Sequence, residues 1–312
     1  MFDLYAAIWK VSGRQQILLI LISMAIAALA AVPLNYQKDI INGLTDGNID
    51  KSVLLWMCAG MMGAILLSLT LKWISGYLSN TLGEDVIRRI RNRIVSGFLD
   101  HPVPGGSGAV ATMVSAEAED LGKFTGSAFS EPVMQLGTLV SVIGFIVATQ
   151  PGLGVIALCM IVPQVVVVLF TQRRVNALIS ERVHILRGAT SEISNEHIAE
   201  AAEQIGRDFD RIYETRKSLF KWKLSTKFIL SSVNGAGTVA VLLLGGGLVL
   251  TGKTDVGTVV AATMGLGRLQ APTAFLIAFY RQVSATRVKY ELLRDAAGVD
   301  PRDVARAGTP SA

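Results

Sequence analysis

Residues 173–227 read RRVNALISERVHILRGATSEISNEHIAEAAEQIGRDFDRIYETRKSLFKWKLSTK, a polar segment between two long uncharged runs. Its 55 residues include 11 Lys or Arg, 8 Asp or Glu and no proline. Apolar residues recur in it every three or four positions, as on one face of an α-helix. They are Ile198, Ala201, Ile205, Phe209, Ile212, Leu219 and Leu224. The segment is too long for a turn and too regular for a disordered linker. It predicts two helices that leave a membrane and meet at a bend, each reaching about 37 Å if it holds about 25 residues.

The composition of the whole chain predicts an all-α membrane protein. Of its 312 residues, 51% are hydrophobic and only 17% are charged, and the mean hydropathy is +0.48. The net charge of +5 would suggest nucleic acid in a soluble protein. Here the basic residues cluster beside apolar runs, which is typical of membrane topology, so we expect a lipid bilayer and no nucleic acid as partner.

Six membrane spans are predicted from the uncharged runs. They cover about 15–37, 53–71, 131–149, 152–172, 228–252 and 256–280. Two long polar loops, 72–123 and 173–227, connect spans two to three and four to five, and HPVPGGSG at 101–108 predicts a bend in the first of them. Asn42-Gly43 and Asp46-Gly47 predict a turn after span one. Pro163 is expected to kink span four.

The two ends of the chain have their own predictions. Residues 1–14 are expected to form an interfacial elbow helix, and residues 282–312 a tail. The apolar side of the elbow would consist of Phe2, Tyr5, Ile8 and Trp9. The termini and the two long loops together hold 25 Lys or Arg, against 3 in the three short loops. This asymmetry places both termini and both long loops in the cytoplasm, for a bacterial-type cytoplasmic membrane.

One stretch matches a nucleotide-binding pattern. Gly247–Thr254 reads GLVLTGKT and satisfies G-x-x-x-x-G-K-[ST]. That pattern binds phosphate only where a strand enters the loop and a helix leaves it. Here it falls at the outer end of a predicted span with no strand before it, so we expect no nucleotide site.

No catalytic residues, metal site or cofactor are expected on this chain. The serines within the spans have no intramembrane histidine to activate them. His101, His184 and His197 lack ligand spacing, and Cys58 and Cys159 fall inside apolar runs, which predicts packed thiols.

Arg268 is the one charge at the centre of a predicted span, with twelve uncharged residues on either side of it in 256–280. A charge at that depth is kept where it meets a partner or water. Because Gly257, Ala261 and Gly265 form a small-residue row beside it, we expect Arg268 to point inward. Three readings stay open: a fixed intersubunit hydrogen bond, a contact to an anionic or polar substrate, and a shifted span six. The other candidate residues of a substrate pathway are Gln164, Asn234 and Glu131.

The order of these features resembles the transmembrane domain of an ABC transporter of the exporter type (type-1 transmembrane region). The resemblance covers nearly the whole chain and rests on several stretches in sequence. They are Val32-Pro33-Leu34 through Lys38-Asp39-Ile40-Ile41 to Gly47, Gly83-Glu84-Asp85-Val86 with Arg91 and His101-Pro102, Gly108–Val114 through Glu119-Asp120-Leu121, and Gly245-Gly246-Gly247, Gly252, Val256-Gly257 and Ala271-Pro272.

This resemblance implies a dimer of twelve spans, as a homodimer or heterodimer. It also implies short coupling helices near 103–113 and 203–212 that dock into a nucleotide-binding domain, the second of them on the partner's ATPase. The coupling residues would be Pro104, Gly108, Val110, Gly206, Arg207, Asp208 and Phe209. The first loop tip, Pro104–Ser107, lacks the aromatic residues often found there.

The family's ATPase domain does not follow the last predicted span, so the resemblance implies that ATP and Mg bind a partner ATPase subunit. Two functions are then open. The chain is either the translocation subunit of an ATP-driven transporter, or a degenerate relative that acts as an assembly or regulatory partner without transport.

Overall fold

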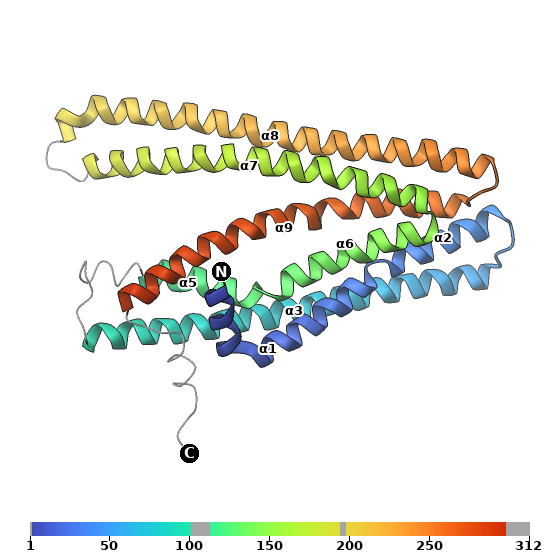
Figure 1. The fold of residues 1–312 in the computed structure, drawn as a ribbon, viewed down its shortest axis with the longest axis horizontal. Helices are drawn as coiled ribbons and strands as arrows, with labels where there is room; N and C mark the ends of the chain where they lie inside the picture. The colour runs from blue at the N-terminus through green and yellow to red at the C-terminus, as the bar shows by residue number, and fades with distance from the viewer. Residues whose placement is uncertain (1, 101–112, 194–197, 298–312) are drawn as a thin grey trace, which may run out of the picture.

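The computed structural model describes residues 2–100, 113–193 and 198–297, and in these ranges the chain is helical with no strand. Long helices lie roughly along the long axis of the molecule (Figure 1). The elements are α1 (Phe2–Leu29), α2 (Val32–Thr45), α3 (Lys51–Asp100), the π-helical turn η1 (Met113–Glu117), α5 (Ala118–Ser127), α6 (Ser130–Thr149), α7 (Pro151–Ile193), α8 (Ile198–Leu250) and α9 (Val256–Ala297).

Three of these helices each combine an apolar run with a polar segment. α3 has 50 residues, α7 has 43 and α8 has 53. The polar segment 173–227 is therefore helical on both sides of residues 194–197, as its periodicity predicts. At a rise of 1.5 Å per residue, α8 is about 80 Å long, far more than a bilayer crossing requires. Pro163 lies inside α7, which continues past it.

Five helical segments in the described ranges are long and apolar enough to cross a membrane. They are Asp3–Thr45, which joins α1 and α2, Lys51–Ser96, Ala118–Thr149, Pro151–Arg182 and Glu203–Leu250. α9 does not meet this criterion, because Arg268, Gln270 and its Gly and Thr residues dilute its apolar content. By length and composition alone, the span predicted at 256–280 is thus less apolar than the other five.

The N-terminal part of α1 packs on the protein. α1 departs from helical geometry at Ser12, where φ is −136°. Before this bend, Leu4 and Ile8 are buried in a cluster with Phe124 of α5 and Phe279 of α9. Trp9 lies edge-on to the Phe129 ring, and its side chain remains 43% exposed.

A second cluster lies where α6, α7, α8 and α9 meet. Val142, Ile146, Leu153 and Val241 are fully buried in it. The α7 and α8 pair lies side by side over its length and also contacts α9, while its far end stands away from α3 and α5 (Figure 1).

Glycines permit the closest helix contacts. A Cβ on Gly237 of α8 would overlap the side chain of Met160 of α7, and a Cβ on Gly126 of α5 would overlap the backbone oxygen of Ser79 of α3. By contrast, a Cβ on Gly235 would meet nothing within 4 Å. Small residues at such positions let apolar helices approach without a hydrophobic driving force.

Candidate functional site

Arg268 contacts a break in the first apolar segment. Its Nη1 donates a hydrogen bond to the carbonyl oxygen of Ala30, at 3.2 Å. This carbonyl lies between α1 and α2, where Pro33 has no N–H to continue the helix. In a continuous helix Ala30 would accept from the Leu34 N–H, but that N–H bonds Ala31 instead, at 3.0 Å. The guanidinium thus satisfies a carbonyl that the break leaves free.

Close contacts between helices fix the depth of Arg268 relative to two amides. Gly245 of α8 lies against Val259 of α9, and Gly237 of α8 lies against Met160 of α7. α7, α8 and α9 run antiparallel in turn (Figure 1). Counting 1.5 Å per residue from these contacts places Arg268, Asn234 and Gln164 within about 5 Å of one another along the helix axes. We call these three residues the midspan polar layer.

The two amides of the midspan polar layer have unmet hydrogen-bonding capacity. Gln164 is one turn from Met160 and Asn234 is one turn from Gly237, so both lie on the faces through which α7 and α8 meet. Gln164 is only 4% exposed, and no hydrogen bond joins its side chain to a described residue. The Oδ1 of Asn234 is buried and also unpaired within the described chain. Neither amide bonds Arg268, whose one hydrogen bond to a described residue goes to Ala30.

Glu131 lies elsewhere. It is in the first turn of α6, where the helix dipole favours a carboxylate. Because Gly265 of α9 lies against Val142 and Ile146 of α6, Arg268 is level with residues near 141. Glu131 is then about 15 Å further along the axis. By this count Arg268, Gln164 and Asn234 lie at about the same depth without contacting one another, and Glu131 lies at a different depth.

The predicted coupling residues fall in two groups. Pro104, Gly108 and Val110 lie outside the described residues. Gly206, Arg207, Asp208 and Phe209 lie near the start of α8. The separate short helix expected at 203–212 is instead part of α8, since the only breaker there is Gly206, and one glycine costs a helix only about 1 kcal/mol.

Side chains in this part of α8 point in different directions. Arg207 is exposed and pairs with Glu203 at 2.6 Å. Phe209 is 48% exposed. Asp208 is only 7% exposed and lies 3.9 Å from Arg211. Asp208 therefore contributes little to the outer surface, whereas Arg207 and Phe209 form part of it.

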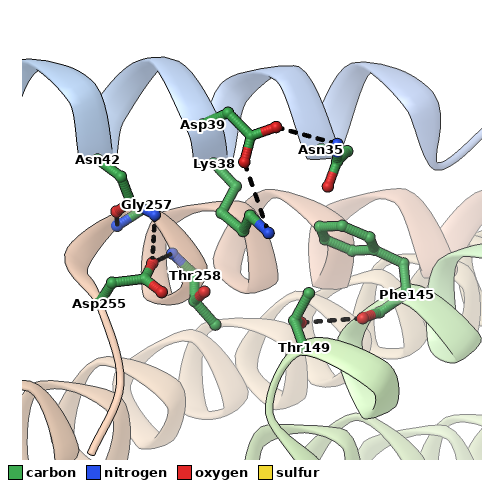
Figure 2. Close-up of polar contacts among 9 residues, drawn as sticks. All are labelled: Asn35, Lys38, Asp39, Asn42, Phe145, Thr149, Asp255, Gly257 and Thr258. Carbon is green, nitrogen blue, oxygen red and sulfur yellow. Dashed lines mark hydrogen bonds and ion pairs between the residues drawn. The ribbon is translucent and has the colours of Figure 1, made fainter. Parts of the chain in front are cut away.

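A polar cluster that sequence reasoning missed joins α2 to the first turn of α9 (Figure 2). The Nδ2 of Asn42 donates to the Oδ1 of Asp255 at 2.7 Å, and the Gly257 N–H donates to the Oδ1 of Asn42 at 2.7 Å. The Thr258 N–H donates to Asp255 at 2.6 Å, so Asp255 is the N-cap of α9. We call Asn42, Asp255, Gly257 and Thr258 the α2–α9 clasp.

The clasp holds Asp255 as a carboxylate. Burial raises the pKa of Asp255, but hydrogen bonds from Thr258 and Asn42 and the charge of Lys38 together outweigh it, so the pKa lies below its ordinary value. An Asp before an apolar run could have indicated the cap. Its partner Asn42 is 213 residues away, and nothing local indicates that pairing.

The predicted turn at Asn42-Gly43 is wrong. Both residues lie inside α2, which continues to Thr45, and the chain turns at Gly47, where φ is +68°. Asn42 is held in the helix because its amide is engaged with α9, while Gly47 supplies the left-handed conformation that the turn requires.

The GLVLTGKT stretch has no phosphate-binding geometry. Gly247 to Leu250 form the last turn of α8, and Gly252 turns the chain with φ +68° towards α9. A helix rather than a strand enters this turn, and the Gly252 and Lys253 N–H groups donate to carbonyls of α8.

Long apolar helices, with a charge and two amides at one depth, define an integral membrane protein with polar groups among its spans. A family model for the ABC transporter transmembrane region matches residues 16–182, from α1 into α7. This is more than half of the chain, and the chain belongs to that family, which indicates a membrane subunit of a transporter. The match is to a transmembrane region and not to a catalytic ATPase domain. Comparison with curated proteins gave no match.

Proposed function

We propose that this chain is the permease subunit of an ATP-driven ABC transporter and moves its substrate by alternating access. The observation that carries the proposal is the continuity of α3, α7 and α8, each of which joins an apolar run to a long polar segment without a helix break. A rigid helix of this kind can transmit movement at its polar end to its membrane end. The family match supports the same function.

In this proposal α9 is the sixth span. It follows α8 after a short turn and packs against both α8 and α6, through Val259 beside Gly245 and Gly265 beside Ile146. Packing at the same depth as two apolar helices supports a membrane crossing by α9 as well. An even number of crossings returns the chain to its starting side, which agrees with both termini being cytoplasmic.

The energy source would be a nucleotide-binding domain outside these 312 residues, which binds ATP and Mg. The coupling segments near 103–113 and 203–212 would contact it. A second transmembrane region, either another copy or a related chain, would complete the pathway. Phe209 and Arg207 support a contact at the second tip, because both are exposed near the start of α8.

Purification from native membranes tests this proposal. The tagged chain, extracted in mild detergent and returned to liposomes, should carry an ATPase and hydrolyse Mg-ATP. Preparations that retain the folded chain but contain no ATPase, and that show no hydrolysis after reconstitution, would contradict a transport role.

A further inference from the structure

We propose that the midspan polar layer binds the anionic group, a carboxylate or phosphate, of the transported substrate. This inference rests on the transport function proposed above and adds the chemical class of the substrate. It begins with an unbalanced charge. The six predicted spans contain no Asp or Glu apart from Glu131, which lies about 15 Å from Arg268 along the axis. Within the described chain, Arg268 therefore has no acidic partner at its own depth.

The unused donors of Arg268 are the second step. A guanidinium carries five N–H donors in a planar fork that matches carboxylate and phosphate oxygens. One donor is engaged with the carbonyl of Ala30 at 3.2 Å. That bond anchors the side chain at the break between α1 and α2, and the side chain remains exposed. Other donors are thus available to a ligand from a group that is already oriented.

The surface around Arg268 differs from a lipid-facing one. The exposed side of α9 along this stretch consists mainly of small residues, Gly267, Ala271, Ala274 and Ala278, with Met264. The exposed side of α3 instead presents large apolar groups such as Leu66, Leu67 and Trp73. Hydrocarbon favours the α3 type of surface, whereas a face with an arginine among small residues suits close approach of another helix or of a ligand.

The amides supply the third step. Gln164 is 4% exposed and unpaired within the described chain, and the Oδ1 of Asn234 is buried and unpaired. An unpaired polar group in an apolar environment is costly, so such groups are kept where a ligand or water pairs with them. These two lie within about 5 Å of the depth of Arg268. Their side-chain NH₂ groups are therefore uncharged donors at about the depth of the guanidinium.

A matched pair of probes tests the charge preference. The full transporter, with its nucleotide-binding partner, is placed in lipid nanodiscs and titrated with 1-pyrenebutanoate or with the neutral 1-pyrenebutanol, followed by pyrene fluorescence. We expect the anion to bind at least tenfold more tightly than the alcohol. We also expect Arg268→Gln to remove most of this difference and Arg268→Lys to keep part of it.

Two further variants complete the design. Arg287→Gln, which makes the same charge change on α9 at a surface ion pair with Glu291, should bind both probes as the wild type does. Gln164→Leu should weaken anion binding and leave the alcohol unaffected. This variant keeps the test open if Arg268→Gln does not fold.

The inference is overturned by equal affinity for anion and alcohol, by anion binding that is no stronger than to empty nanodiscs, or by unchanged anion binding in Arg268→Gln. The inference is also overturned if both Arg268 variants lose subunit assembly while Gln164→Leu binds the anion normally. That result would assign Arg268 to a hydrogen bond between subunits. ATP hydrolysis by the same nanodiscs separates the two proposals. If it persists while charge selectivity is absent, only the anion site is wrong, and if it is absent in the wild type, the transport function itself is wrong.

Discussion

The backbone oxygen of Lys38 on α2 occupies the space that a Cβ on Gly257 would need, so the first turn of α9 lies directly against α2. This contact also brings the Gly257 N–H to the side chain of Asn42 at 2.7 Å. Two segments more than two hundred residues apart are therefore joined at one end of the bundle through a glycine and an asparagine (Figure 2).

Gly257→Ala should destabilise the protein. The new methyl group would overlap backbone that cannot move as a flexible side chain does, and overpacking of this kind costs about 1–3 kcal/mol. Thermal unfolding in detergent, followed by tryptophan fluorescence, measures the effect. Gly267→Ala on the same helix is the control, because a Cβ there meets nothing within 4 Å. Equal melting temperatures for the two variants would show that α2 and α9 do not lie this close.

The contribution of Asp255 to stability should depend on pH. Its pKa in the folded protein lies below the ordinary value of 3.8, so its charge stabilises the fold at higher pH, and this contribution is lost as the pH falls through the lowered pKa. Asp255→Asn, which keeps a capping side chain, should therefore lower the melting temperature at pH 7. The difference in melting temperature between Asp255→Asn and the wild type should become smaller below about pH 4.

Asp46→Asn, a charge change at an exposed loop residue, is the control for this pH series. A difference between wild type and Asp255→Asn that stays constant from neutral to acid pH would mean that the carboxylate is not held by the clasp.

Gly237→Ala should weaken the contact between α7 and α8. The methyl group would overlap the side chain of Met160, which has to change rotamer or move, at a cost of about 1–3 kcal/mol. In a Met160→Ala background the neighbouring side chain is truncated. There, the same Gly237→Ala change should lower the melting temperature less than it does in the wild type. Gly235→Ala, two residues away on the same helix, should have little effect. Similar melting temperatures for Gly235→Ala and Gly237→Ala would contradict the observed register of α7 and α8.

A cysteine at position 209 should cross-link to an ATPase partner more efficiently than one at position 208. Phe209 is 48% exposed and Asp208 is 7% exposed, so only the first presents a thiol to a neighbouring protein. Gel shifts after treatment with a short bifunctional maleimide measure the yield. The native Cys58 and Cys159 are first changed to serine, because both are exposed and not packed as the sequence predicts. A higher yield at position 208, with an active partner, would place the contact on the other side of α8.

Lys253→Ala should leave the nucleotide affinity of the purified chain unchanged. The lysine lies in a turn between two helices, where the nearby N–H groups already bond carbonyls of α8. Equilibrium binding of a fluorescent ATP analogue to the wild type and the variant measures this. ATP affinity that disappears with Lys253 would show that the GLVLTGKT stretch does bind phosphate.

Periodicity and composition determined the helical class, the membrane location and the two long helical segments on either side of residues 194–197. Burial in lipid or against a neighbouring helix requires apolar residues at regular positions, and this pattern is visible in the sequence alone. The family resemblance came from the order of short stretches, and the family match bears it out. The local motif at 247–254 could also be judged from sequence, since its function depends on which element precedes it.

Only the tertiary structure decided which polar residues meet. Arg268 could be identified as unusual from its apolar surroundings, but its bond to Ala30 depends on how α9 crosses the break between α1 and α2, 238 residues away in the chain. The hydrogen bond between Asn42 and Asp255 likewise joins residues far apart in the chain. This bond to the side-chain amide of Asn42 keeps the residue in a helix, although the dipeptide Asn42-Gly43 favours a turn. Such pairs depend on the axial register and crossing of the helices, which close contacts such as Gly237 against Met160 determine. The hydrophobic pattern of the sequence indicates which face of a helix is buried. It does not indicate how far the helix is shifted along its axis relative to a neighbouring helix.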